Sequence, residues 1–103
     1  MKTEWYYDSA AYGVQDWNRG GTLFLARLTV HEDGTAQVLG ADGVVHKFPD
    51  TQLADEWLTD EEYKRLQDLV DDFREDNHPM DPRIKEPVGD TPEELVKQMC
   101  IRL

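Results

Sequence analysis

Residues 22–48 read TLFLARLTVHEDGTAQVLGADGVVHKF, and this stretch decides the fold of the 103-residue chain. Three segments in it are rich in apolar and β-branched residues, as β-strands are: 22–31, 35–39 and 44–48. Asp33-Gly34 and Asp42-Gly43 separate these segments, and an Asp-Gly pair supplies the positive φ that a tight hairpin turn requires. The stretch therefore predicts a three-stranded antiparallel meander.

The aromatic cluster Trp5-Tyr6-Tyr7 favours a fourth strand near the N-terminus. Successive side chains of a strand point to opposite faces, so these three rings cannot all enter one core. The sheet is therefore either covered on both faces or exposes aromatic surface. We expect residues 1–48 to form the sheet, with a glycine-containing loop over residues 8–21.

Residues 50–73 are predicted to be helical. Asp50 or Thr51 can cap a first helix that reaches residue 58. The apolar face of this helix would contain four residues, Leu53, Ala54, Trp57 and Leu58.

A second helix is predicted over residues 60–76. Thr59 and Glu62 have the spacing of a capping box at its start. An apolar stripe at helical spacing follows, made of Tyr63, Leu66, Leu69, Val70 and Phe73.

Residues 75–90 contain three prolines and are expected to form a long loop. Thr91 and Glu94 fit another capping box, with Pro92 at the first helical position. This motif predicts a C-terminal helix over residues 91–103.

The predicted elements indicate a single α+β domain over residues 1–103. An antiparallel β-meander of three to four strands from the N-terminal half packs against two to three helices from the C-terminal half. We expect a two-layer arrangement around one core.

Charge is distributed unevenly along the chain. The sequence contains 22 acidic and 11 basic residues, a formal net charge of -11. Residues 51–103 hold 15 of the acidic residues and 7 of the basic ones. Such a charge argues against direct binding of nucleic acid or anionic lipid, which would be repelled, and it suits a basic protein as partner.

Acidic residues also cluster on one side of the predicted second helix, opposite its apolar stripe: Glu61, Asp68, Asp71, Asp72 and Glu75. Pairs of like charge four residues apart each cost about 0.2–0.5 kcal/mol. The helix dipole also disfavours anions near a C-terminus. A recognition surface for a basic partner would explain this arrangement; the alternative is an ordinary solvated face.

Tyr12 and Trp17 lie in the predicted loop over residues 8–21. Exposed tyrosine and tryptophan side chains are good interface anchors. The alternative is that both rings pack against the edge of the core.

The sequence contains no motif that predicts catalysis, a metal site or a cofactor. The histidines and the cysteine lack zinc-ligand spacing, and phosphate-binding loops and nucleophile elbows are missing. Cys100, the only cysteine, excludes an intramolecular disulfide, and we expect it to be a buried structural thiol in the C-terminal helix. No signal peptide or membrane-spanning run is present, so a reducing cytoplasmic location is expected.

The function that the sequence favours is that of a small, acidic, non-enzymatic protein-interaction module. In shape and charge the predicted outline resembles that of some small bacterial inhibitor and immunity proteins, and many small bacterial proteins without assigned activity. Two alternatives stay open: a small enzyme or ligand-binding domain with a pocket between sheet and helices, and an accessory subunit of a larger assembly. Charge repulsion favours a monomer.

Overall fold

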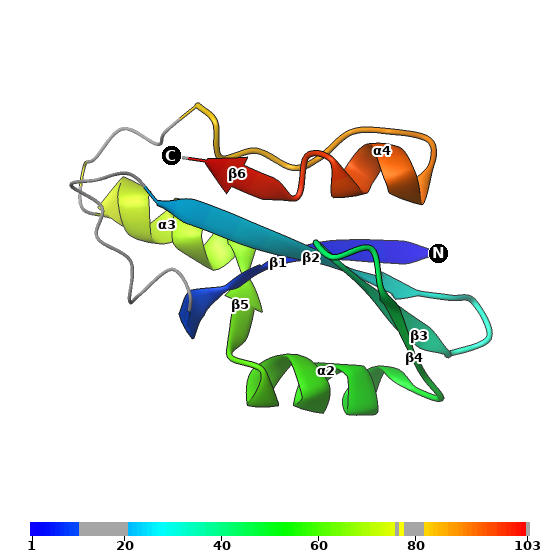
Figure 1. Ribbon diagram of the computed structural model, residues 1–103. Coiled ribbons are helices and arrows are strands. Elements are labelled where there is room, and N and C mark those ends of the chain that lie inside the picture. Colours follow the sequence, from blue (N-terminus) through cyan, green and yellow to red (C-terminus); the bar gives the residue numbers. More distant parts are fainter. Residues whose placement is uncertain (11–20, 76, 78–81, 103) are drawn as a thin grey trace.

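The computed structural model describes residues 1–10, 21–75, 77 and 82–102, and it has an α+β fold (Figure 1). Its elements, in chain order, are β1 Lys2–Asp8, β2 Thr22–Val30, β3 Ala36–Gly40, β4 Val45–Phe48, α2 Thr51–Asp60, β5 Tyr63–Arg65, α3 Leu66–Glu75, α4 Pro92–Val96 and β6 Cys100–Arg102. The predicted fold class is therefore confirmed: strands from the N-terminal half pack with helices from the C-terminal half.

The strands form an antiparallel sheet in the order β4-β3-β2-β1-β5, and β6 pairs with the first residues of β2. The predicted meander corresponds to β2, β3 and β4, and β1 is the fourth strand. Gly34 and Gly43 have φ values of 90° and 83°, as the hairpin turns require. Asp33 and Asp42 each accept a hydrogen bond, at 3.0 Å, from the backbone N–H two residues ahead. Both turns are thus fixed by local chemistry.

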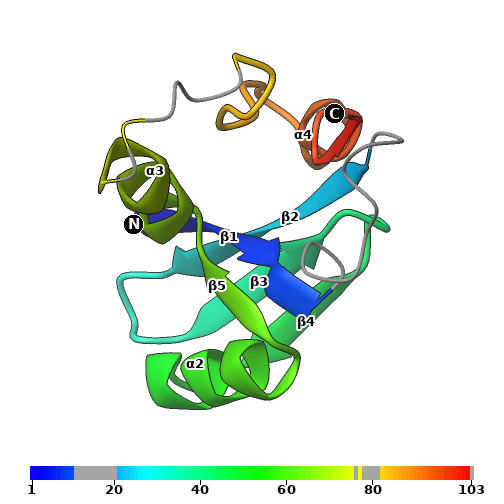
Figure 2. The same ribbon diagram turned by 90° about the vertical axis from the view of Figure 1, so that its left-hand side faces the viewer.

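Both faces of the sheet are covered, which corrects the predicted two-layer arrangement. Helix α2 lies on one face, whereas α3, α4 and β6 lie on the other (Figures 1 and 2). The rings of Trp5 and Tyr7 are buried on the α3 and α4 side, and the ring of Tyr6 is buried on the α2 side. Alternation along β1 therefore sends the three aromatic side chains into two separate cores.

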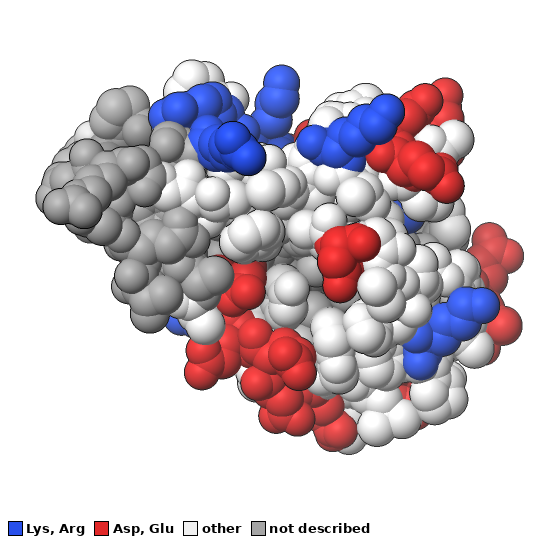
Figure 3. All heavy atoms as spheres, in the orientation of Figure 1, with Lys and Arg blue, Asp and Glu red and all other residues white. Residues whose placement is uncertain are grey.

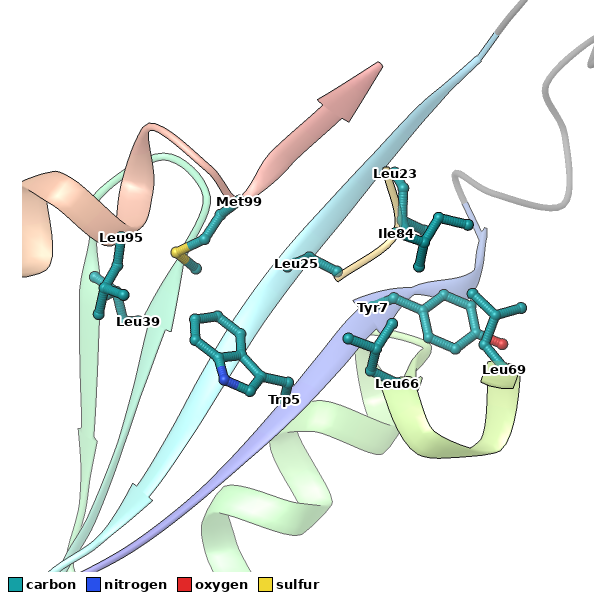
Figure 4. Packing of buried hydrophobic residues seen from close by; sticks show 10 residues of the cluster. All are labelled: Trp5, Tyr7, Leu23, Leu25, Leu39, Leu66, Leu69, Ile84, Leu95 and Met99. Carbon is teal, nitrogen blue, oxygen red and sulfur yellow. The ribbon is translucent and has the colours of Figure 1, made fainter. Parts of the chain in front are cut away.

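The larger core lies between the sheet and the α3, α4 and β6 layer. In Figure 4, Leu95 and Met99 lie near Leu39 and Trp5. Ile84, from the predicted proline-rich loop, is buried in the same core. The described part of that loop therefore helps to cover the sheet.

The predicted second helix over residues 60–76 is wrong in its first part. Helix α2 ends at Asp60, Glu62 has a φ of 60°, and β5 follows before α3 begins. Thr59 therefore caps no helix. The reason is tertiary: β5 pairs with β1, and Ser9 N–H donates to the Glu62 carbonyl at 3.0 Å, so backbone pairing replaces the local capping box.

The predicted C-terminal helix begins as expected but is much shorter. The Thr91 side chain accepts a hydrogen bond from Glu94 N–H at 3.3 Å, which confirms the cap. The helix ends at Val96, and Cys100 belongs to β6. Cys100 is exposed, so the predicted buried thiol is wrong. Pairing of β6 with β2 places Met99 in the core and leaves Cys100 at the surface.

Candidate functional site

Four acidic residues of α3 lie on the side of the helix that faces away from the core. We call this set the α3 acidic face; it consists of Asp68, Asp71, Asp72 and Glu75. Leu66 and Leu69, on the opposite side, are buried against the sheet. The helical periodicity of the sequence therefore placed these four acids on one helix face correctly, because α3 is helical over all four.

The α3 acidic face is only partly neutralised. Asp68 is half-buried, and one of its carboxylate oxygens lies 3.2 Å from Arg65 Nη2. That hydrogen bond is the main cause that raises the pKa of Arg65 above its ordinary value. Asp71 accepts a hydrogen bond from the Gln67 amide at 3.0 Å. Within the described residues, no lysine or arginine forms an ion pair with Asp71, Asp72 or Glu75, and all three are exposed.

The other predicted site residues lie elsewhere. Glu61 is the C-terminal cap residue of α2, and β5 separates it from the α3 acidic face. It is exposed, but it does not share a helix with the four acids. Tyr12 and Trp17 lie outside the described residues.

A second feature is a group of half-buried aromatic rings centred on Trp57. The ring centroid of Trp57 lies 4.6 Å from that of His46, 5.9 Å from Phe48 and 6.1 Å from Tyr63. The group borders a hollow of about 660 Å³, which we call the aromatic hollow. No local sequence pattern reveals it, because its rings come from β4, α2 and β5, which only the fold brings together.

Carboxylates stand at the rim of the aromatic hollow: Asp8 at the end of β1, Asp42 in the β3–β4 turn, and Glu61. Burial is the main cause that raises the pKa of Tyr63, and these three carboxylates raise it further. In Figure 3, acidic side chains on the viewed face gather around the C-terminal end of α2, whereas basic side chains gather at the top, over β6. On this face, acidic and basic side chains therefore gather in different places.

A third feature is a groove of about 500 Å³ between α2 and the β1 side of the sheet, which we call the α2–β1 groove. Leu28, Val30 and Leu58 contribute its apolar lining, and the buried Tyr6 also lines it. Burial is the main cause that raises the pKa of Tyr6 to about 12, and Glu4 and Asp55 raise it further. The groove combines an apolar lining with polar groups, which is the usual composition of a small-molecule site.

No three histidine, cysteine, aspartate or glutamate side chains in the part of the chain that the structure describes are grouped so that they could hold a metal ion. No helix in that part is long and apolar enough to cross a membrane.

Comparisons with known proteins add no relative. No family model, no curated protein and no solved structure matches the chain.

Proposed function

We propose that this chain is a non-enzymatic protein-interaction module that binds a basic partner protein through the α3 acidic face. The observation that carries the proposal is the group of three exposed carboxylates, Asp71, Asp72 and Glu75, without a described cationic partner. The opposite side of α3 is anchored in the core, so the carboxylates are presented on a fixed support.

The energetics of α3 support this proposal. Asp68 and Asp72, and likewise Asp71 and Glu75, are like charges four residues apart, each pair costing about 0.2–0.5 kcal/mol. Glu75 is the last residue of the helix, where the dipole disfavours an anion. A helix adapted only for stability would carry bases at these positions. Binding of a basic surface would relieve the repulsion that the free protein tolerates.

The partner in this proposal is a basic protein such as a nuclease, a toxin or another nucleic-acid-binding protein. The chain would bind this protein as an inhibitor or immunity-like binder. Carboxylates at fixed positions compete for the cationic groups that bind phosphates. The aromatic hollow, with Glu61 at its rim, would supply a separate, apolar contact. A reducing, cytoplasmic setting remains part of the proposal, because it suits a chain with a single cysteine.

Affinity capture with matched charge variants tests the proposal. The wild type and the variant Asp71→Asn, Asp72→Asn, Glu75→Gln are immobilised and exposed to a lysate of the source organism, and retained proteins are identified by mass spectrometry. We expect the wild type to retain a specific basic protein, the variant to lose it, and salt to release it.

A second triple variant controls for net charge: Glu32→Gln, Glu56→Gln, Asp60→Asn. These three carboxylates are also exposed, so this variant has the same net charge as the first but keeps the α3 acidic face. It should capture the partner as the wild type does. Equal loss of the partner in both variants would refute a role for this particular face, and retention by both would refute the electrostatic mechanism.

A further inference from the structure

The α2–β1 groove is separate from the α3 acidic face and has the dimensions of a ligand site. Its volume of about 500 Å³ lies within the range of about 300–1,000 Å³ that is usual for small-molecule sites. Helix α2 forms one wall with Thr51, Asp55 and Thr59, which are four residues apart and therefore share a face. Strand β1 forms the other wall, where Glu4 and Tyr6 line the groove.

Tyr6 offers a polar group in this groove that the protein does not use. The residue is only 8% exposed, and its hydroxyl makes no hydrogen bond to another described residue. Tyr6 also lines a second hollow, of about 640 Å³, together with Lys64 and Asp68. The hydroxyl remains accessible from the groove, where it can accept a hydrogen bond from a ligand.

The charges around Tyr6 indicate what kind of group could bind there. Glu4, Asp55 and Asp68 each act on the Tyr6 hydroxyl as negative charges, and Arg65 is the one cation among its main electrostatic neighbours. Arg65 is itself held by two carboxylates, at 3.2 Å from Asp68 and 3.6 Å from Glu4. Arg65 is therefore offset by its own partners, and the Asp55 carboxylate on the facing wall of the groove remains to bind a positively charged hydrogen-bond donor.

We propose that the α2–β1 groove binds a small organic amine. Its ammonium group would donate hydrogen bonds to the Tyr6 hydroxyl and the Asp55 carboxylate. Its apolar body would lie on Leu28, Val30 and Leu58. Lys2 lines the groove as well, but it sits beside Val30, two residues along β1 from Glu4 and four from Tyr6. The proposal does not depend on the partner protein, because the two groups that would bind the ammonium, Tyr6 and Asp55, lie outside the α3 acidic face.

The test is a titration of the ¹⁵N-labelled full chain followed by two-dimensional NMR. Hexylamine is compared with hexan-1-ol and hexanoate, which have the same chain length but carry no positive charge. We expect hexylamine to shift the amide signals of Glu4, Tyr6, Leu28 and Asp55 and to bind about tenfold or more tightly than the other two probes, since hydrogen bonds to charged groups contribute about 1.5–3 kcal/mol.

Three variants locate the site. Tyr6→Phe removes only the hydroxyl, and Asp55→Asn removes only the charge; each should weaken hexylamine binding about tenfold. Glu56→Gln removes the neighbouring exposed carboxylate, which does not line the groove, and should leave the affinity unchanged. If Tyr6→Phe does not give a folded spectrum, the comparison of hexylamine affinity between Asp55→Asn and Glu56→Gln decides alone.

Three outcomes would overturn the proposal: hexan-1-ol that binds as tightly as hexylamine, unchanged affinity in Asp55→Asn, or no shift at the groove. Shifts confined to α3 would also overturn it, while leaving the proposed protein partner unaffected. Loss of protein capture by the α3 variants, in turn, has no bearing on the groove. The two proposals therefore fail separately.

Discussion

At the scale of single residues, burial separates side chains that look equivalent in the sequence. Leu53 and Leu58 both belong to the predicted apolar face of the helix that became α2. In the structure Leu58 is 1% exposed and packed against the sheet, whereas Leu53 is 43% exposed. Helical periodicity identifies a face, but only contact with the sheet decides which of its residues become core.

The two leucines give a direct test of this difference. Leu58→Ala should lower the free energy of unfolding by about 2–5 kcal/mol, because it leaves a cavity in the core. Leu53→Ala, on the same helix, should change it by less than about 1 kcal/mol. Urea denaturation measures both values. Similar losses in the two variants would contradict the assigned packing of α2.

Tyr6 provides a test at alkaline pH. Its pKa is about 12 in the folded protein, above the ordinary value of 10.0. Between these values the folded state holds the proton that the unfolded chain releases, so the free energy of unfolding should fall as the pH rises. The stability that the raised pKa of Tyr6 provides is fully present below pH 10 and is lost as the pH rises from 10 to about 12. One unit of pKa corresponds to about 1.4 kcal/mol, so the full loss is about 2–3 kcal/mol.

The comparison with Tyr6→Phe isolates this effect. Burial also raises the pKa of Tyr63. The free energy of unfolding of the variant should therefore still fall as the pH rises, but by less than in the wild type. Urea denaturation of both proteins at several pH values from about 9 to about 12 measures the difference. A decrease of equal size in wild type and variant would show that Tyr6 is not the source.

At the scale of elements, the junction between α2 and β5 is where local and tertiary preferences conflict. Two capping boxes occur in the sequence, at Thr59 and at Thr91. The one at Thr91 is used, because residues 92–96 have no competing strand partner. The one at Thr59 is not used, because residues 63–65 pair with β1 instead. The same motif thus predicts a helix correctly only where no strand edge competes for its backbone.

Substitution of Glu62 by glycine distinguishes a turn at residue 62 from a continuous helix, because the free energy of unfolding should change with opposite sign in the two cases. Glu62 has a φ of 60°, and this conformation costs a non-glycine residue about 1–2 kcal/mol. Glycine avoids that cost, but it loses more conformational entropy on folding, which costs about 0.5–1 kcal/mol. We expect Glu62→Gly to raise the free energy of unfolding by about 0.5–1 kcal/mol.

The control is Glu56→Gly, within α2, which should lower the free energy of unfolding by about 1 kcal/mol. Thermal or urea denaturation measures both variants. A loss of stability in Glu62→Gly similar to that in Glu56→Gly would indicate that the helix continues through residue 62.

At the scale of the whole molecule, the net charge of -11 is weakly compensated. Ion pairs among described residues include the N-terminal amine with Glu32, at 3.9 Å, and Arg65 with Glu4 and Asp68. The side chains in these pairs are at least 44% exposed, so each pair contributes little. Repulsion among the carboxylates should therefore oppose folding at low ionic strength.

Salt should consequently stabilise the protein. From about 0.01 M to about 1 M salt the Debye length falls from about 30 Å to about 3 Å, which screens the repulsion. We expect the Tm to rise over this range, and to rise less in the variant Asp71→Asn, Asp72→Asn, Glu75→Gln, which should also have the higher Tm at low salt. Differential scanning calorimetry measures these values. A Tm that falls with salt, or a less stable variant, would show that these carboxylates stabilise the fold.

The candidate sites differ in how far the sequence could predict them. The α3 acidic face follows from helical spacing within one short segment, and periodicity alone located it. The α2–β1 groove does not, because Tyr6, Leu28 and Asp55 lie on three elements that are far apart in the sequence. Glu61 does not belong to the α3 acidic face, because it caps α2 and β5 intervenes before α3 begins.

The sequence by itself determined the features that a few neighbouring residues control. The Asp-Gly turns, the strands beside them, and the caps at Asp50 and Thr91 depend on φ preferences and hydrogen bonds within three residues. The tertiary structure alone decided that residues 63–65 and 100–102 become strands, that both sheet faces are covered, and that a groove opens beside α2. These features depend on backbone and side-chain partners distant in the sequence, and such contacts outweigh local preferences that are worth only about 1 kcal/mol per residue.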